Sequence, residues 1–241
     1  MSVRHGQSRN SKTQPSKAQQ PFQRGDLIVS CQADDESPMA APEFIRALAL
    51  AAIQGGARGL RLEGAANIRA VRGATELPII GLIKRRGAFE HIYITPELSD
   101  AAAVADAGAD MVAFDATLRD RPVAVAELVR EVHARGLIAL ADIATVDDAE
   151  HALAAGADLV STTLSGYTDS SPQQAGPDLE LIAALAAQGI YPLAEGRIRT
   201  PEEAAEALRR GAYAVVVGGA ITRPELLTAR FAGALRPIHG H

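Results

Sequence analysis

A repeated alternation between two kinds of segment constrains the fold of this 241-residue chain more than any other feature. After residue 26, short runs of Val, Ile, Leu and Ala alternate with alanine-rich stretches of helical length. The runs occupy residues 27–31, 59–63, 78–83, 111–115, 137–142, 159–163, 190–195 and 214–219. They are apolar on both faces, which is typical of strands buried in a parallel sheet. The alternation therefore predicts parallel strands connected by helices.

The stretches between the runs carry the signals of α-helices. Helices are predicted at residues 43–54, 65–74, 98–107, 122–135, 147–155, 178–187 and 201–210. The last of these has a clear start, because Thr200 can act as N-cap, Pro201 suits the first helical position and Glu203 can complete a capping box.

A Gly-Ala dipeptide closes every second helix at a nearly constant spacing. Its four copies begin at Gly56, Gly108, Gly156 and Gly211. Glycine suits the left-handed residue that ends a helix. Four copies of a two-strand, two-helix unit give eight βα units, which predicts a single (β/α)8 TIM barrel over residues 26–241. A doubly wound open sheet is the alternative, although such sheets seldom contain eight evenly paired strands.

The first 25 residues differ in composition from the rest of the chain. They contain five basic and no acidic residues among many Ser, Gln and Pro, whereas residues 26–241 carry a net charge of −10. This composition predicts a disordered tail rather than a nucleic-acid-binding arm or a transit peptide. The acidic charge of the remaining residues argues against nucleic acid as the main partner.

The same composition excludes other classes of protein. No stretch approaches the roughly 18 apolar residues of a membrane span, so we expect no membrane partner and a cytoplasmic location. Cys31 is the single cysteine, which excludes an intramolecular disulfide and a cysteine zinc cluster. The six histidines show no metal-ligand spacing, and no metal site is expected.

Polar side chains gather at the carboxyl ends of the predicted strands, where barrels of this kind have their active sites. They are Ser30, Cys31, Gln32, Arg61, Glu63, Lys84, Asp115, Thr117, Asp142, Thr162, Thr163 and Glu195. Lys84, Asp142 and Glu195 end three alternate strands, so their side chains can converge on the barrel axis. A converging Lys and Glu shift each other's proton affinity and suit proton transfer. The alternative is a structural network of ion pairs.

A second feature is the segment VVVGGAITRP at residues 215–224. A strand that runs into Gly218 and Gly219 and then into a short helix presents free backbone N–H groups to an anion. Phosphate often binds at the loops after strands 7 and 8 of a barrel. Gly196, Arg197 and Arg223 lie in these loops, which predicts a phosphate site. A plain tight turn is the alternative.

Three further residues have less specific signals. Cys31 has no histidine at a neighbouring strand end to activate it as a nucleophile. Asp115 and Glu63 are expected to orient Arg61, Lys84 or substrate hydroxyls rather than to bind a metal. A lysine at a strand end also allows Schiff-base chemistry, as in aldolases.

The motifs resemble those of the N-acylglucosamine-6-phosphate 2-epimerases. The resemblance runs from about residue 27 to 235 and is carried by VSCQ (29–32), LRLEG (60–64), PIIGLIKR (78–85), ITP (94–96), FDATLRDRP (114–122), LADIATVDDA (140–149), STTLSGYT (161–168), LAEGRIRTP (193–201) and VVVGGAITRP (215–224). It departs from the family at residues 86–91, where an acidic turn is more usual. The family interconverts N-acetylmannosamine 6-phosphate and N-acetylglucosamine 6-phosphate in sialic acid breakdown, without metal or organic cofactor.

The resemblance implies roles for individual residues. Lys84 and Glu195 correspond to the family's proton-transfer pair, and Asp142 to its supporting carboxylate, which we expect to orient Lys84. The expected substrate contacts are Gln32, Arg61, Thr162 and Arg223, with Arg223 also on phosphate beside Gly218 and Gly219.

The expected reaction is epimerisation at C2 of the open-chain sugar through an enolate, stabilised by Lys84 or Arg61. Two alternatives stay open. One is a Schiff-base aldolase or another phosphate-binding barrel isomerase that uses Lys84. The other is a non-catalytic regulator that binds a sugar phosphate. A homodimer is also expected, because such barrels often associate through their outer helices.

Overall fold

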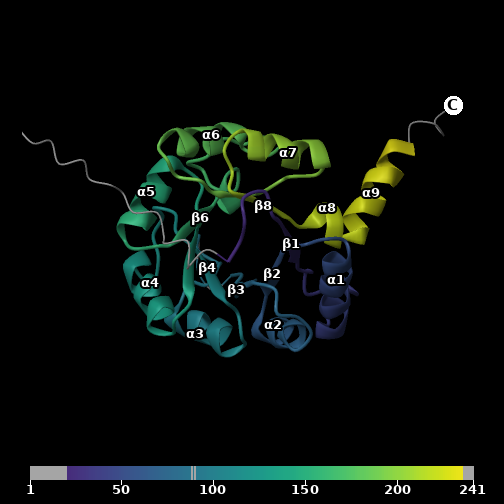
Figure 1. The fold of residues 1–241 in the computed structure, drawn as a ribbon, viewed down its shortest axis with the longest axis horizontal. Helices are drawn as coiled ribbons and strands as arrows, with labels where there is room; N and C mark the ends of the chain where they lie inside the picture. The colour runs from purple at the N-terminus through teal and green to yellow at the C-terminus, as the bar shows by residue number, and fades with distance from the viewer. Residues whose placement is uncertain (1–20, 88, 90, 236–241) are drawn as a thin grey trace, which may run out of the picture.

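Eight parallel strands form a closed barrel in the computed structural model, which describes residues 21–235 except 88 and 90 (Figure 1). The strands are β1 (Leu27–Cys31), β2 (Gly59–Glu63), β3 (Ile79–Leu82), β4 (Met111–Asp115), β5 (Ile138–Asp142), β6 (Leu159–Ser161), β7 (Leu193–Glu195) and β8 (Ala214–Val217). Because β1 also pairs with β8, the sheet has no free edge. The predicted TIM barrel is confirmed, and the open sheet is wrong.

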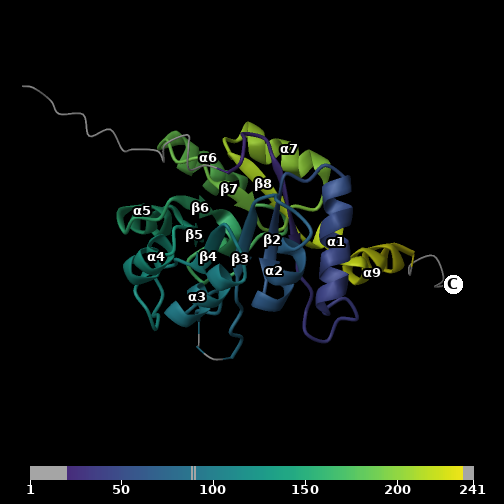
Figure 2. The same ribbon diagram turned by 60° about the horizontal axis from the view of Figure 1, so that its bottom comes forward.

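Helices surround this barrel as an outer ring (Figures 1 and 2). They are α1 (Pro42–Gln54), α2 (Ala65–Arg72), α3 (Leu98–Asp106), α4 (Val125–Ala134), α5 (Val146–Ala154), α6 (Leu179–Ala187) and α7 (Pro201–Arg209), followed by α8 (Gly219–Thr222) and α9 (Pro224–Leu235). The helix α9 projects away from the barrel (Figure 1). Within the described ranges, no helix combines the length and the apolarity needed to cross a membrane.

The repeated glycines have the conformation that the sequence predicts. Gly56, Gly108, Gly156 and Gly211 all have φ between 94° and 111°. A β-carbon at Gly211 would also lie 2.4 Å from Cβ of Ala186. The helix that follows Thr200 begins with the predicted capping box, in which the Thr200 side chain accepts a hydrogen bond from Glu203 N. These local signals therefore place the ends of the helices around the barrel.

Mostly aliphatic side chains pack on both faces of the barrel wall, outside it against the helices and inside it around the axis. Val, Ala, Leu and Ile on the outer face of the strands pack against the helices, and one cluster inside the barrel includes Ile28, Leu82, Met111, Leu140 and Val216. Interdigitated side chains of this kind form the interior of a (β/α)8 barrel. Polar side chains such as Arg61 and Asp142 are buried toward its carboxyl end, as described below.

The barrel begins earlier in the sequence than predicted. Phe22 is only 3% exposed and belongs to the cluster inside the barrel. Gly25 N donates to the carbonyl oxygen of Tyr213 at 2.8 Å, and Tyr213 Oη donates to the carbonyl oxygen of Phe22 at 3.0 Å. Phe22 therefore contributes to the core, although the sequence predicts it to lie in the tail that ends at residue 25. Residues 1–20 of the predicted tail lie outside the described residues.

The sixth strand is shorter than predicted. It ends at Ser161, and Thr162–Leu164 form one turn of 3-10 helix. The hydroxyl of Thr162 donates to the backbone oxygen of Glu195 at 2.9 Å and accepts from its backbone nitrogen at 3.1 Å. A side chain therefore replaces backbone pairing at this seam, where β6 and β7 share a single registered pair, Ser161 with Leu193.

Candidate active site

A cavity of about 540 Å³ opens at the carboxyl end of the barrel. Seven basic residues contribute to its wall, namely Arg61, Lys84, Arg86, Arg197, Arg199, Arg223 and Arg230. Among the described residues that line it, Glu195 is the only acidic one. Such an excess of positive charge in a concave site favours an anionic ligand.

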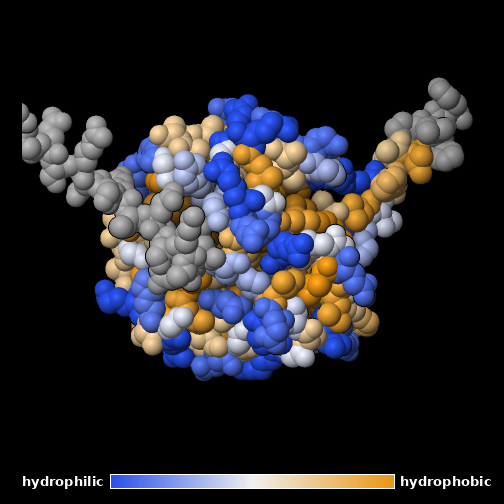
Figure 3. Space-filling view, in the orientation of Figure 1, coloured by the Kyte–Doolittle hydropathy of each residue, from blue (hydrophilic) through white to orange (hydrophobic). Residues whose placement is uncertain are grey.

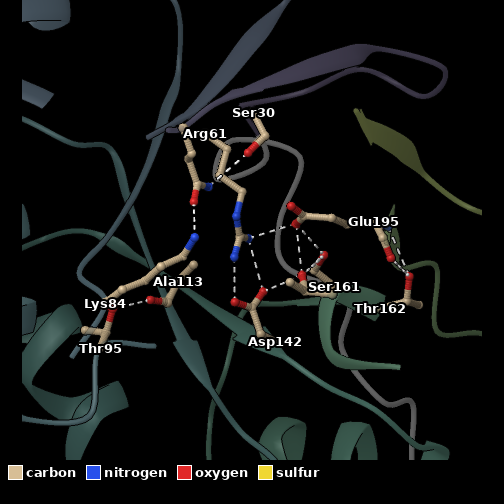
Figure 4. A network of polar contacts seen from close by, with 11 residues as sticks. Ser30, Arg61, Lys84, Thr95, Ala113, Asp142, Ser161, Thr162 and Glu195 are labelled. Atoms are coloured by element: carbon tan, nitrogen blue, oxygen red, sulfur yellow. Dashed lines mark hydrogen bonds and ion pairs between the residues drawn. The ribbon is translucent and has the colours of Figure 1, made fainter. Parts of the chain in front are cut away.

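Arg61 lies at the centre of a buried ion-pair network. Its Nη1 and Nη2 are 3.1 Å and 2.6 Å from the two carboxylate oxygens of Asp142, and Nη1 is also 3.1 Å from Oε2 of Glu195 (Figure 4). The Arg61 and Asp142 side chains are 1% and 0% exposed. Burial alone lowers the pKa of Arg61, but the charges of Asp142 and Glu195 outweigh it and raise the pKa. Arg61 is therefore a permanent cation.

Lys84 follows β3 and is held by a glutamine. Its Nζ donates to Oε1 of Gln32 at 2.6 Å, and Nε2 of Gln32 donates to the Ser30 hydroxyl at 2.9 Å. Burial lowers the pKa of Lys84, with the charges of Arg86 and Arg61 adding to the effect, against those of Glu63 and Glu195. Lys84 is thus more readily available as a neutral amine than an exposed lysine.

Glu195 ends β7 and has the opposite shift. Burial raises the pKa of Glu195, and the charge of Asp142 adds to this, whereas Arg61, a hydrogen bond with Thr163 and the charge of Lys84 lower it. The net effect raises the pKa. A lysine with a lowered pKa and a glutamate with a raised pKa in one cavity form a suitable pair for general acid–base catalysis.

The structure corrects the expected partner of Asp142. Its two oxygens bind Arg61, whereas Lys84 binds Gln32, so Asp142 does not orient the lysine. The contact from β2 to β5 joins residues 81 positions apart in the sequence. No local motif indicates such a pairing, because it depends on how far a long arginine side chain reaches across the barrel.

The structure also separates the two threonines that follow β6. Thr162 is 2% exposed and is bound to the backbone of Glu195, so it lies outside the cavity wall. Thr163 lines the cavity instead, with Oγ1 2.8 Å from Asp142 Oδ1 and 2.9 Å from Glu195 Oε2. The 3-10 turn places the second hydroxyl in the site; the sequence places Thr163 among the polar residues at the strand ends, but the expected substrate contacts include Thr162 instead.

The residues predicted to bind phosphate line the same cavity. They are Gly196, Arg197, Gly218, Gly219 and Arg223. The backbone oxygens of Gly176 and Ser165 accept from Nε and Nη1 of Arg197 at 2.8 Å and 2.6 Å. Its buried Nη2 has no partner among the described residues. Arg197 therefore retains a donor for an anion.

Two close contacts hold the arginines of this wall. A β-carbon at Gly166 would lie 2.2 Å from Nη1 of Arg197, so only glycine allows the guanidinium to pass there. Nη2 of Arg223 donates to Asp34 at 2.6 Å, and its Nε donates to Glu225. Arg223 is consequently paired with two carboxylates at the mouth of the cavity.

Other polar residues at strand ends have structural partners. Glu63 Oε1 accepts from the backbone nitrogen of Lys84 at 3.3 Å, as expected of an orienting residue. Asp115 instead accepts from Thr117 and Arg119 in the β4–α4 loop, so its expected contact with Arg61 or Lys84 is wrong. Cys31 is completely buried, and burial raises the pKa of its thiol to about 12. Such a thiol is a poor nucleophile.

Metal ligands are not grouped in the part of the chain that the structure describes. It contains no set of three or more His, Cys, Asp or Glu side chains that could hold a metal ion. The fold and the cavity together define the class of protein, which is a (β/α)8-barrel enzyme with a lysine and a glutamate of opposite pKa shifts in a cationic site.

Comparisons with known proteins narrow this class. The family model described as "Putative N-acetylmannosamine-6-phosphate epimerase" matches residues 45–237. The bifunctional enzyme NanE/NanK of Brucella melitensis is 53% identical over 212 residues, which cover 88% of this chain and 41% of that protein. A Klebsiella pneumoniae protein named "Putative N-acetylmannosamine-6-phosphate 2-epimerase" is 48% identical over 213 residues, covering 88% of this chain and 90% of the relative.

A solved structure agrees with these sequence matches. The N-acetylmannosamine-6-phosphate 2-epimerase of Clostridium perfringens superimposes with a TM-score of 0.86 at 41% identity, covering 97% of this chain and all of the other. The chain thus belongs to the N-acetylmannosamine-6-phosphate epimerase family, and the resemblance seen in its motifs is confirmed. It spans about two-fifths of the length of the bifunctional Brucella relatives.

Proposed function

We propose that the chain catalyses cofactor-independent epimerisation at C2, which interconverts N-acetylmannosamine 6-phosphate and N-acetylglucosamine 6-phosphate in sialic acid catabolism. The observation that carries the proposal is the acid–base pair itself. Lys84 and Glu195 line one cationic cavity, and burial moves the pKa of Lys84 down and the pKa of Glu195 up. Membership of the family supports the choice of substrate.

The phosphate group binds at the loops that follow β7 and β8 in this proposal. The unpartnered Nη2 of Arg197 and the side chain of Arg223 supply positive donors there. Backbone N–H groups at Gly196, Gly218 and Gly219 supply further donors, which glycine leaves accessible to a close-lying anion. Gln32 and Arg61, which line the cavity deeper in the barrel, contact the sugar.

The chemistry starts from the open-chain aldehyde. Its C2 proton is acidic because the electron pair left behind is delocalised into the carbonyl group as an enolate. The neutral amine of Lys84 takes this proton from one face, and protonated Glu195 delivers a proton to the other face of C2. Lys84 then carries the proton and Glu195 is ionised, so the reverse reaction uses the two groups in exchanged roles. The positive charge of Arg61 stabilises the enolate.

The test uses the purified full chain with N-acetylmannosamine 6-phosphate. We expect the anomeric proton signals of N-acetylglucosamine 6-phosphate to appear in the NMR spectrum, and Lys84→Ala to abolish their growth. Binding without conversion would contradict the proposal and favour a sugar-phosphate-binding regulator. Covalent trapping of substrate on Lys84 by borohydride would favour a Schiff-base enzyme.

A cytoplasmic location belongs to the same proposal and fits the single free cysteine.

We further propose that the protein is a homodimer and that α9 forms its interface. The helix has no buried residue, and its Leu226, Phe231 and Leu235 are 46%, 74% and 56% exposed. Figure 3 shows apolar side chains along this projecting arm. An exposed apolar face of this kind marks an interaction surface. Since Leu226, Leu227 and Arg230 of α9 also line the cavity, the second copy would stabilise one wall of the site.

Light scattering tests the dimer. The native chain should have twice the mass of its polypeptide, and Phe231→Glu should shift it toward the monomer, because a charge in an apolar interface is costly to bury. Leu118→Glu is the matched control, as Leu118 is 58% exposed on the β4–α4 side. A monomeric native chain would contradict this proposal.

A further inference from the structure

A single hydroxyl group lies between the two carboxyl groups of the site. Oγ1 of Thr163 is 2.8 Å from Oδ1 of Asp142 and 2.9 Å from Oε2 of Glu195. The hydroxyl oxygen of Ser161 is 2.9 Å from Oγ1 of Thr163. Oγ1 of Thr163 therefore has three oxygen neighbours at hydrogen-bond distance, although a hydroxyl has only one proton to donate and two lone pairs that accept.

This count of protons limits the states of the carboxyl groups. If Asp142 and Glu195 were both ionised, Thr163 could donate to only one of them. The other contact would then place two oxygens without a proton between them at less than 3 Å. Both contacts become hydrogen bonds when one carboxyl group carries a proton and donates it to Thr163, while Thr163 donates to the other. Ser161 then donates to the remaining lone pair.

The surroundings decide which carboxyl group carries the proton. Asp142, from β5, is fully buried and faces both terminal nitrogens of Arg61 from β2, which favours its ionised form. Glu195, from β7, meets Arg61 through one nitrogen at 3.1 Å. Burial raises the pKa of Glu195 and the charge of Asp142 raises it further, against the charges of Arg61 and of Lys84 after β3. A hydrogen bond from Thr163 lowers this pKa only when the hydroxyl donates to Glu195, and its single proton is then withdrawn from Asp142. The proton therefore belongs on Glu195.

We propose that Thr163 is a positioning residue that determines which of the two carboxyl groups carries the proton. Its hydroxyl donates a hydrogen bond to Asp142 and accepts one from protonated Glu195. Glu195 is thereby held as a carboxylic acid, while Asp142 stays paired with Arg61. The catalytic consequence rests on the proposed function. Once Glu195 has given its proton to C2, the single proton of Thr163 serves only one of the two carboxylates, and the other contact is left without a hydrogen bond. Thr163 therefore favours the return of a proton to Glu195.

The direct test is the titration of Glu195 in the full chain without substrate. Carbon-13 label on the glutamate side-chain carboxyl groups gives the signal, and Glu195→Gln assigns it by its loss. We expect Thr163→Val to lower the pKa of Glu195, because the protonated form loses its acceptor. The same variant should lower kcat about 10- to 100-fold with little change in KM. Thr163→Ser, which keeps the hydroxyl, should restore both properties.

Ser161→Ala is the matched control, since it leaves both carboxyl contacts of Thr163 in place and removes from Glu195 only a long contact, the 3.5 Å between the Ser161 hydroxyl and Oε2. Its Glu195 titration should stay close to that of the native chain. A raised or unchanged pKa of Glu195 in Thr163→Val would contradict the proposal, because a raised value means that Thr163 donates to Glu195. Thr163→Ala has the same expected outcome if the valine variant does not fold.

The proposal and the proposed function fail separately. A native chain without epimerase activity would contradict the proposed function, whereas the titration of Glu195 would still decide the role of Thr163.

Discussion

Two residues with opposite pKa shifts are the basis of the account at the scale of the residue. Lys84 and Glu195 come from different strands, and burial acts on both by making their charged forms less favourable. For the lysine this lowers the pKa, and for the glutamate it raises the pKa. The two groups consequently approach a common range in which a proton can move from one to the other through the substrate.

The pH dependence of kcat/KM follows from this pair. The active form holds one proton on the pair, so activity falls at low pH, where both groups are protonated, and at high pH, where neither is. The raised pKa of Glu195 moves the acid limb above the usual range of a glutamate, and the lowered pKa of Lys84 moves the basic limb below that of a lysine. A pH–rate profile with limbs at the ordinary values of both residues would contradict the account.

The sequence predicts the site residues that depend only on strand ends. Lys84, Asp142 and Glu195 follow from the rule that the carboxyl ends of parallel strands share one face of a barrel. The partners of these residues do not follow, because they depend on side-chain reach and rotamer. Asp142 binds Arg61 from across the barrel, and Lys84 binds Gln32.

At the scale of the element, the turn after β6 determines which threonine enters the site. The apolar run at residues 159–163 predicts a strand that continues to residue 163. In the structure the strand ends at Ser161 and a 3-10 helix follows. The cause is a tertiary contact, since Thr162 pairs with the backbone of Glu195 on β7. Local sequence carries no signal of that contact. Helix ends were more predictable because caps and glycines act within a few residues.

Thr162→Val tests the role of that contact in stability. The substitution keeps the volume but leaves a buried backbone N–H and C=O of Glu195 without their side-chain partner. We expect the free energy of unfolding to fall by about 1–3 kcal/mol. Denaturant unfolding measures it, and Thr162→Ser, which keeps the hydroxyl, provides the comparison. Equal stability of both variants would show that the hydroxyl does not hold the seam.

At the scale of the whole molecule, a repeat of βα units predicts the closed barrel, whereas the start of the domain cannot be predicted from composition. Pro21–Gly25 lie in a basic, polar stretch, and yet Phe22 fills the amino end of the barrel against Gly59. One aromatic side chain among polar neighbours gives no periodic signal. Its burial depends on the space that Gly59 leaves, since a β-carbon there would lie 2.4 Å from Phe22.

Phe22→Ala measures this contribution. The cavity left inside the barrel should lower the free energy of unfolding by about 3–5 kcal/mol. Thermal unfolding should respond with a drop of about 2–4 °C for each kcal/mol. Phe44→Ala on α1 is the matched control, because that side chain is 45% exposed and should cost much less. Similar melting temperatures for the two variants would place residue 22 outside the folded unit.

Exchange of the C2 proton with deuterated water tests the central claim most directly. The native enzyme should place deuterium at C2 of the product, because the proton removed by one group is not the one delivered by the other. In Glu195→Gln, Lys84 should still exchange the C2 proton of one epimer without converting it, and the other epimer should not exchange. NMR of both N-acetylhexosamine 6-phosphates measures this. Conversion by the native enzyme without deuterium at C2, or exchange of both epimers by the variant, would contradict a mechanism with one proton-transfer group on each face.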